Sequence, residues 1–95
     1  MKGNKKIWRK KQKILIVDDA EFNRNMLKEI LEETYHYLEA ENGNQAIQMI
    51  GDNPGIDLML LDINMPQMNG FEVLEIMKKG QRRMDTSESL DILML

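Results

Sequence analysis

The chain has 95 residues, enough for one domain, and carries a formal net charge of −3. It lacks Cys and has five aromatic residues against nine Met, which excludes a disulfide framework and leaves no visible aromatic platform for stacking nucleic-acid bases. Only four apolar residues separate the basic start of the chain from Asp18, too few for a signal-peptide core or a membrane span, and we expect a cytoplasmic protein.

The basic residues are concentrated at the start of the chain. Residues 1–13 hold seven Lys or Arg and no acidic residue, whereas residues 14–95 hold six basic and sixteen acidic residues. We interpret residues 1–12 as a solvated basic tail. Such a tail could touch an anionic membrane or a nucleic acid, but the sequence favours neither, and nucleic-acid binding is not expected of this chain.

A strand and a helix are predicted after the tail. Lys13–Asp18 is short, rich in Ile and Val and apolar on both faces, which predicts a buried strand. The segment from about Glu21 to Glu33 has apolar residues at helical spacing, which predicts an amphipathic helix. Its predicted apolar face comprises Phe22, Met26, Leu27, Ile30 and Leu31.

A second strand and a second helix follow. Tyr35–Ala40 is short and β-prone, which predicts the strand. Asn42 and Asn44 lie in a turn sequence, and either could be the N-cap of a short helix through Ala46–Ile50. The cluster Gly51–Gly55 contains Gly and Pro residues that cannot continue a helix, so we expect the helix to stop there.

The same alternation continues through the rest of the chain. Asp57–Asp62 is predicted as the third strand and Phe71–Lys79 as the third helix. Residues 81–89 are polar and lack periodicity, and Asp91–Leu95 begins a fourth apolar strand. Strands that alternate with helices indicate parallel strands joined by right-handed crossovers, hence an α/β sandwich.

Two of the predicted strands end on carboxylates. Asp18 and Asp19 follow the first apolar run, and Asp62 ends the third. If these strands are neighbours, about 5 Å apart, the acids converge at the sheet edge where ligand sites of such folds lie. Carboxylates that close repel each other unless a cation or protons intervene, and Mg²⁺ suits them because it binds oxygen and needs only one or two carboxylates.

The arrangement of these acids also suggests phosphoryl chemistry. The pair at the first strand can hold the ion, while Asp62 is free to attack phosphorus and form an acyl phosphate. The main-chain carbonyl of Asn64 could complete the ligand set. Pro66 stiffens the loop that follows, and Gly70 permits a tight entry into the third helix. An isolated Asp-Asp pair is usually a solvated strand end, so the hypothesis depends on the whole combination.

Three motifs resemble those of a known family. The segments ILIVDD at residues 14–19, EAENG at residues 39–43 and LLDINMPQMNGFEVL at residues 60–74 closely resemble the receiver domain of bacterial two-component response regulators. The resemblance spans roughly residues 13–79. It implies a flavodoxin-like three-layer α/β sandwich with a parallel sheet in the order 2-1-3-4.

The resemblance also implies roles for the acids. Asp62 would be the phosphoacceptor, and Mg²⁺ would be held by Asp18, Asp19 and Asp62 with the main-chain carbonyl of Asn64. The family takes its phosphoryl group from a sensor histidine kinase or a phosphotransfer protein and switches an output surface in response. The implied function is phosphorelay signalling, and we do not expect an enzyme.

The resemblance is incomplete toward the C-terminal side. In a complete receiver a Thr or Ser at the end of the fourth strand contacts the phosphoryl group, and a Lys at the end of a fifth strand pairs with it. Leu95 stands where the residue before that hydroxyl would be. We therefore expect residues 13–95 to form a receiver truncated at its C-terminal end, without the fifth strand and the last helices. Its last strand would be an uncovered apolar edge at which two copies could pair.

Two other functions fit parts of the sequence. A degenerate receiver could dock a kinase or another receiver without being phosphorylated, which the missing hydroxyl and Lys favour. An aspartate-based phosphohydrolase also uses a carboxylate and Mg²⁺, but it typically has Asp-x-Asp after its first strand, whereas this chain has Asp18-Asp19-Ala20. His36 is the only histidine and is expected to have a packing or surface role, so His-based chemistry is not predicted.

Overall fold

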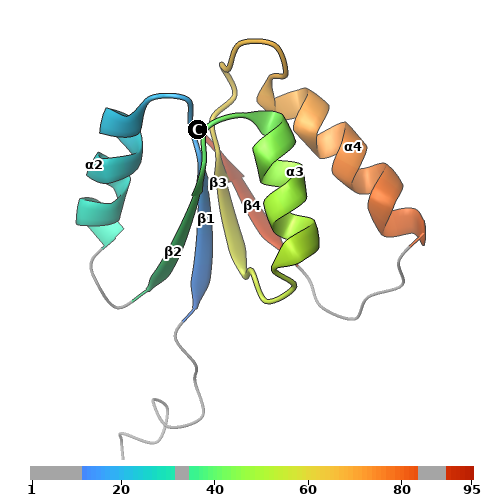
Figure 1. Cartoon of the computed structure of the whole chain (residues 1–95), viewed down its shortest axis with the longest axis horizontal. Helices are drawn as coiled ribbons and strands as arrows, with labels where there is room; N and C mark the ends of the chain where they lie inside the picture. Colours follow the sequence, from blue (N-terminus) through green and yellow to red (C-terminus); the bar gives the residue numbers. More distant parts are fainter. Residues whose placement is uncertain (1–11, 32–34, 84–89) are drawn as a thin grey trace, which may run out of the picture.

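Strands and helices alternate along the chain, as the sequence predicts (Figure 1). The computed structural model describes residues 12–31, 35–83 and 90–95, so the predicted tail, residues 1–12, lies outside the described residues except for Gln12. The elements are β1 (Lys13–Val17), α2 (Glu21–Leu31), β2 (His36–Ala40), α3 (Gly43–Asp52), β3 (Leu58–Leu61), α4 (Gly70–Arg83) and β4 (Asp91–Met94).

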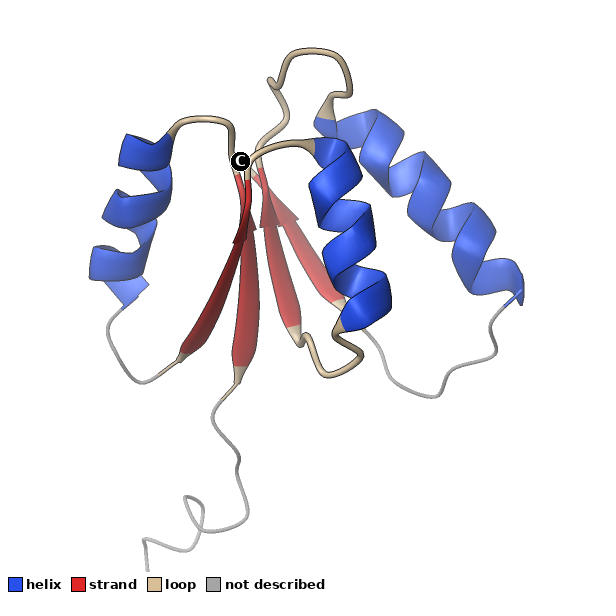
Figure 2. Cartoon of the chain, viewed as in Figure 1, coloured by secondary structure: helices blue, strands red, loops and turns tan. Residues whose placement is uncertain are grey.

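The strands form one parallel sheet in the order β2-β1-β3-β4, which confirms the predicted order 2-1-3-4. α2 covers one face of the sheet, and α3 and α4 cover the other, so the predicted three-layer α/β sandwich is confirmed as well (Figure 1). All four strands point the same way, and the loops that follow β1, β2 and β3 gather at one edge (Figure 2). The predicted acids belong to two of these loops, because Asp18 and Asp19 follow β1 and Asp62 follows β3.

Alternate side chains of β1 supply two separate cores, because successive side chains of a strand point to opposite faces. Ile14 and Ile16 form one small core with Leu60, on the α2 side. Leu15 and Val17 face the other way and join the larger core under α3 and α4. The buried members of the larger core are Leu15, Val17, Ala40, Ala46, Ile56, Met59, Leu61, Met65 and Val73.

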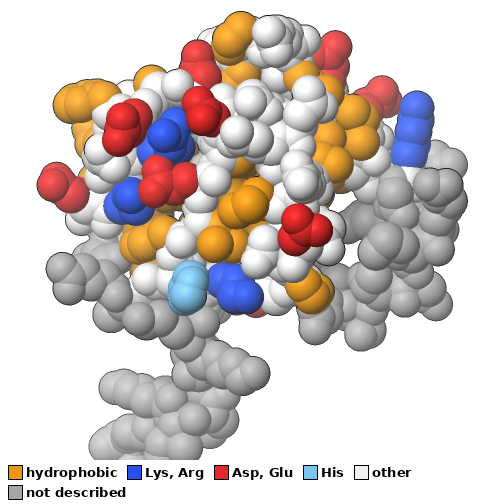
Figure 3. Space-filling view, viewed as in Figure 1, with side chains coloured by type: hydrophobic (Ala, Val, Ile, Leu, Met, Phe, Trp, Pro, Cys, Tyr) orange, Lys and Arg blue, Asp and Glu red, His pale blue; other side chains and the backbone are white. Residues whose placement is uncertain are grey.

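Only part of the predicted apolar face of α2 reaches the sheet. Leu27 and Leu31 pack against the small core, whereas Phe22, Met26 and Ile30 are exposed, Phe22 by 73% and Ile30 by 66%. The predicted amphipathic helix is present, but only part of its apolar face is buried. The two groups lie about 120° apart around the helix, and the sheet contacts only one of them. Figure 3 shows hydrophobic side chains at the surface on this side of the molecule. The predicted helix end, residues 32 and 33, lies outside the described residues.

α3 is longer than predicted at both ends. It covers Gly43–Asp52 instead of Ala46–Ile50, and of the two candidate N-caps it is Asn42 whose side chain accepts a hydrogen bond from the backbone N–H of Gln45. The helix continues through Gly51, because an interior Gly costs only about 1 kcal/mol relative to Ala. It ends at the C-cap Asn53, whose backbone and side-chain N–H groups both donate to a carbonyl of the last turn.

α4 also extends beyond its predicted end. It reaches Arg83 instead of Lys79, since Gly80 lowers helix propensity without removing a backbone hydrogen-bond donor. Asn69 and Glu72 cap its start reciprocally, each accepting the backbone N–H of the other with its side chain. Within the described ranges, no helix combines the length and apolar composition needed to cross a bilayer.

β4 lies at one edge of the described sheet. It pairs with β3 from Asp91 opposite Leu58 to Met94 opposite Leu61. Leu93 is 53% exposed and Leu95 50% exposed, in agreement with the predicted apolar edge. That two copies of the chain pair at this edge stays a prediction.

Two glycines of α3 give a matched test of this packing. A Cβ at Gly43 would lie 2.7 Å from the sulfur of Met68 and 2.8 Å from a methyl carbon of Val73, whereas a Cβ at Gly51 meets nothing within 4 Å. We expect Gly43→Ala to lower the free energy of unfolding by about 1–3 kcal/mol, because α3 must move away from α4. Gly51→Ala should raise it by up to about 1 kcal/mol through helix propensity. Urea unfolding of both variants checks this, and equal effects would contradict the close approach.

Candidate functional site

The three predicted acids follow strands that end at the same level. Val17 pairs with Ala40 on one side and with Leu61 on the other, so the next residues, Asp18 and Asp62, leave the sheet side by side. The ladder continues one step further on both sides of β1. The backbone N–H of Asp18 donates to Ala40 at 3.1 Å, and that of Asp62 donates to Val17 at 3.0 Å.

Asp18, Asp19 and Asp62 form a carboxylate cluster. One oxygen from each lies within 4.8 Å of the other two. Asp18 is 7% exposed, Asp62 is half-buried and Asp19 is exposed, so the cluster opens to solvent through Asp19. Oxygens bound to one Mg²⁺ at about 2.1 Å lie at most about 4.2 Å apart. A small movement of the three carboxylates toward one another would therefore let them bind one ion. The all-oxygen donor set also suits Mg²⁺.

The β3–α4 loop fixes the carboxylate of Asp62. Its Oδ1 accepts the backbone N–H of Asn64 at 3.1 Å, which places the main chain of Asn64 at the site. Gly70 packs directly under the loop, since a Cβ there would lie 3.0 Å from the carbonyl oxygen of Asp62. The predicted tight entry into the helix at Gly70 is thereby confirmed. The loop is strained between Asn64 and Gly70, because Gln67 has a φ of 72°.

The pKa of Asp62 is raised above its usual value. Partial burial is the main cause, and the negative charges of Asp18 and Asp19 add to it, while the hydrogen bond from Asn64 opposes the shift. A raised pKa means that the ionised Asp62 is less stable in the folded chain than in the unfolded one. A cation at the cluster would relieve this repulsion.

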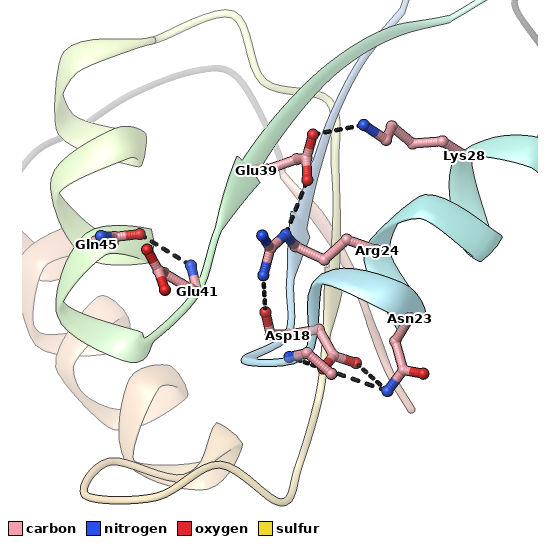
Figure 4. Close-up of polar contacts among 8 residues, drawn as sticks. Asp18, Asn23, Arg24, Lys28, Glu39, Glu41 and Gln45 are labelled. Carbon is pink, nitrogen blue, oxygen red and sulfur yellow. Dashed lines mark hydrogen bonds and ion pairs between the residues drawn. The ribbon is translucent and has the colours of Figure 1, made fainter.

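Asp18 is held by several contacts of its own (Figure 4). Its Oδ1 accepts the backbone N–H of Ala20 at 2.9 Å, which forms the turn into α2. The side-chain amide of Asn23 lies 3.4 Å from both carboxylate oxygens. The first turn of α2 therefore orients the Asp18 carboxylate.

An ion-pair bridge, which the sequence did not predict, joins α2 to β2 beside this acid. The bridge consists of Arg24, Lys28 and Glu39: Arg24 Nε donates to Glu39 Oε1 at 2.8 Å, and Lys28 Nζ donates to Glu39 Oε2 at 2.6 Å (Figure 4). Arg24 Nη1 also donates to the main-chain carbonyl of Asp18 at 2.7 Å. The available signal was the i, i+4 spacing of two cations on the helix after the acid pair. In Figure 3 basic and acidic side chains lie next to one another on the α2 side.

The pKa of Glu39 is lowered by its two partners. The hydrogen bond from Lys28 contributes most and the one from Arg24 next, and both outweigh the opposite effect of burial. The bridge therefore favours the folded state when Glu39 is ionised.

The structure brings the predicted site residues together. The carboxylates of Asp18, Asp19 and Asp62 converge, and the backbone of Asn64 contacts Asp62. His36 lies exposed at the start of β2, at the opposite end of the strands from the cluster. The roles of the acids as phosphoacceptor and metal ligands, and of the Asn64 carbonyl as a ligand, stay predictions.

Known proteins are similar to this chain in sequence. Residues 14–95 match the family described as response regulator receiver domain. The chemotaxis protein CheY of Halobacterium salinarum is 44% identical over 69 residues, which cover 72% of this chain and 57% of that protein. The chain thus spans little more than half the length of this curated relative.

Solved structures share its fold. A CheY-like response regulator receiver domain protein from Methanospirillum hungatei superimposes with a TM-score of 0.75 at 28% identity, over 90% of this chain and 64% of that one. The receiver domain of Saccharomyces cerevisiae Ssk1, crystallised with the histidine phosphotransfer protein Ypd1, gives 0.73 at 21% identity, over 88% and 61%. At 21% identity, the similarity to the Ssk1 receiver domain shows only that the two chains share a fold.

The raised pKa of Asp62 predicts a stability change that can be measured without any phosphodonor. We expect Asp62→Asn to raise the melting temperature of the metal-free protein at pH 7, because it removes a carboxylate that is destabilised by folding. The gain should vanish as the pH falls below the usual value of 3.8, where the wild-type carboxyl is protonated in both states. Glu75→Gln, which removes an exposed charge of α4, should change little. A lower melting temperature for Asp62→Asn would contradict this account.

The lowered pKa of Glu39 predicts the opposite pH dependence. Glu39→Gln should cost about 1 kcal/mol at pH 7, since both ion pairs are partly exposed. The stabilisation in the wild type is complete above the usual value of 4.5 and is lost as the pH falls through the lowered folded-state pKa. Urea unfolding of both proteins between pH 7 and pH 3 measures this, and a difference as large at pH 3 as at pH 7 would refute it.

Proposed function

This chain belongs to the response regulator receiver family, and from that premise we propose that Asp62 accepts a phosphoryl group in two-component signalling. The observation that carries the proposal is the convergence of Asp62 with Asp18 and Asp19 at the carboxyl edge of the sheet, within 4.8 Å. The chain acts as a stoichiometric acceptor in the cytoplasm and turns over no free substrate.

In this proposal the cluster holds Mg²⁺. Asp18, Asp19 and Asp62 supply carboxylate oxygens, and the Asn64 carbonyl lies on the backbone that already contacts Asp62. When bound, the ion offsets negative charge on the transferring phosphoryl group. Mg²⁺ retains several waters, which agrees with a cluster that is open to solvent at Asp19.

The residues around Asp62 prepare it for transfer. The N–H of Asn64 engages Oδ1 and so fixes the rotation of the carboxylate. Partial burial raises the pKa of Asp62, which makes its ionised form a better nucleophile. A carboxylate oxygen forms the new bond to phosphorus, the P–N bond of a phosphohistidine donor breaks, and its electron pair stays on the imidazole nitrogen.

The proposed donor is a sensor histidine kinase or a histidine phosphotransfer protein. The support is the complex of the Ssk1 receiver domain with Ypd1, a protein of that kind. Asp62 is half-buried, so part of its side chain faces solvent, from which a donor imidazole can approach it.

Phosphorylation can be tested directly. Incubation with acetyl phosphate and Mg²⁺ should give one phosphoryl adduct by intact mass, and EDTA should suppress it. Asp62→Asn should abolish the adduct, and Asp18→Asn should slow its formation at least about tenfold through loss of a ligand. Asp57 is an acid at the other end of β3, so Asp57→Asn is the matched control and should leave the amount of adduct unchanged. No adduct in the wild type, or one that persists in Asp62→Asn, would refute the proposal.

A further inference from the structure

Arg24 connects three parts of the molecule next to the acid cluster: helix α2, the end of β2 and the residue that follows β1. It lies in the first turn of α2, its Nε contacts Glu39 near the end of β2, and its Nη1 contacts the carbonyl of Asp18 just after β1. Its side chain is only 14% exposed, compared with 31% for Lys28. A simple surface ion pair would need only the contact with Glu39.

The contact with Asp18 fixes one peptide plane of the site. The N–H of Asp18 is already bound to Ala40 and its carboxylate to Ala20, so the guanidinium holds the remaining backbone group. That carbonyl belongs to the peptide bond between Asp18 and Asp19. The torsion angles on either side of this peptide set where the exposed Asp19 lies relative to the other two carboxylates, so a fixed peptide helps to hold Asp19 in the cluster.

Glu39 orients the guanidinium for this task. The fork of an arginine side chain presents several N–H groups in one rigid plane, so binding Nε to Glu39 determines where Nη1 points. Lys28 binds the second oxygen of Glu39 and contacts neither Asp18 nor the cluster in the described contacts. Arg24 and Lys28 therefore share one partner, but only Arg24 reaches the site.

We propose that Arg24 is a positioning residue for divalent-cation binding, acting through the Asp18–Asp19 peptide. This rests on the proposed function in one respect, that the cluster binds Mg²⁺. Arg24 acts by holding the Asp18 carbonyl in place and not by its charge. Its positive charge, which Glu39 offsets, would by itself oppose a cation at the acids.

The test is calorimetric titration of the metal-free chain with MgCl₂ alone. Arg24→Gln should weaken Mg²⁺ binding about tenfold, as loss of a group that orients metal ligands commonly does. Arg24→Lys keeps the charge but cannot bridge both acceptors, so it should weaken binding as well. Lys28→Gln removes the other ion pair of Glu39 and should stay within about twofold of the wild type. If Arg24→Gln fails to fold, Arg24→Lys against Lys28→Gln carries the test.

A second readout needs no metal. The amide of Asp19 shares the peptide plane that Arg24 holds, so its ¹⁵N shift and hydrogen-exchange protection in the metal-free protein should change in Arg24→Gln and not in Lys28→Gln.

The outcomes separate the two proposals. A wild type that binds Mg²⁺ while Arg24→Gln binds equally well or more tightly overturns the positioning role alone. A wild type that binds no Mg²⁺ overturns the metal site of the proposed function and this inference with it. Weaker binding in both Arg24 variants, with Lys28→Gln unaffected, supports the positioning role.

Discussion

The parallel pairing of β1 with both of its neighbours is the constraint on which the site depends. Val17 is level with Ala40 and Leu61, so the chain leaves β1 and β3 at adjacent points of one edge. Because the side chains of β1 are buried on both faces, a slip of its register by one residue would move each of them into the other core, where the packing is different. The hydrophobic core therefore holds the acids together, although it touches none of their charges.

Holding like charges together has a cost that the surrounding contacts only partly offset. Partial burial raises the pKa of Asp62 most, the charges of Asp18 and Asp19 add to the shift, and the hydrogen bond from Asn64 opposes it. Asp18, the most buried member, has the largest set of contacts. The site thus combines a preformed geometry with unrelieved repulsion, and a cation that binds the folded state and not the unfolded one would stabilise it by mass action.

The errors in the prediction have identifiable physical causes. Periodicity placed Phe22 and Leu27 on one face of α2, but a helix on a sheet buries a narrower stripe than its apolar residues can cover. The helices α3 and α4 pass glycines at which they were predicted to end, because a single Gly weakens a helix without removing a backbone donor. Each error concerns how far a local pattern extends, and tertiary packing decides that.

Local patterns were enough to predict the alternation of strands and helices, and short motifs that resemble those of a family were enough to predict the strand order and the three acids of the cluster. The contacts around these acids became visible only in the folded chain. Arg24, Lys28 and Glu39 are ordinary surface charges in the sequence, and their bridge exists because α2 packs beside β2. A contact between residues distant in the chain is set by the packing of whole elements, which no local pattern encodes.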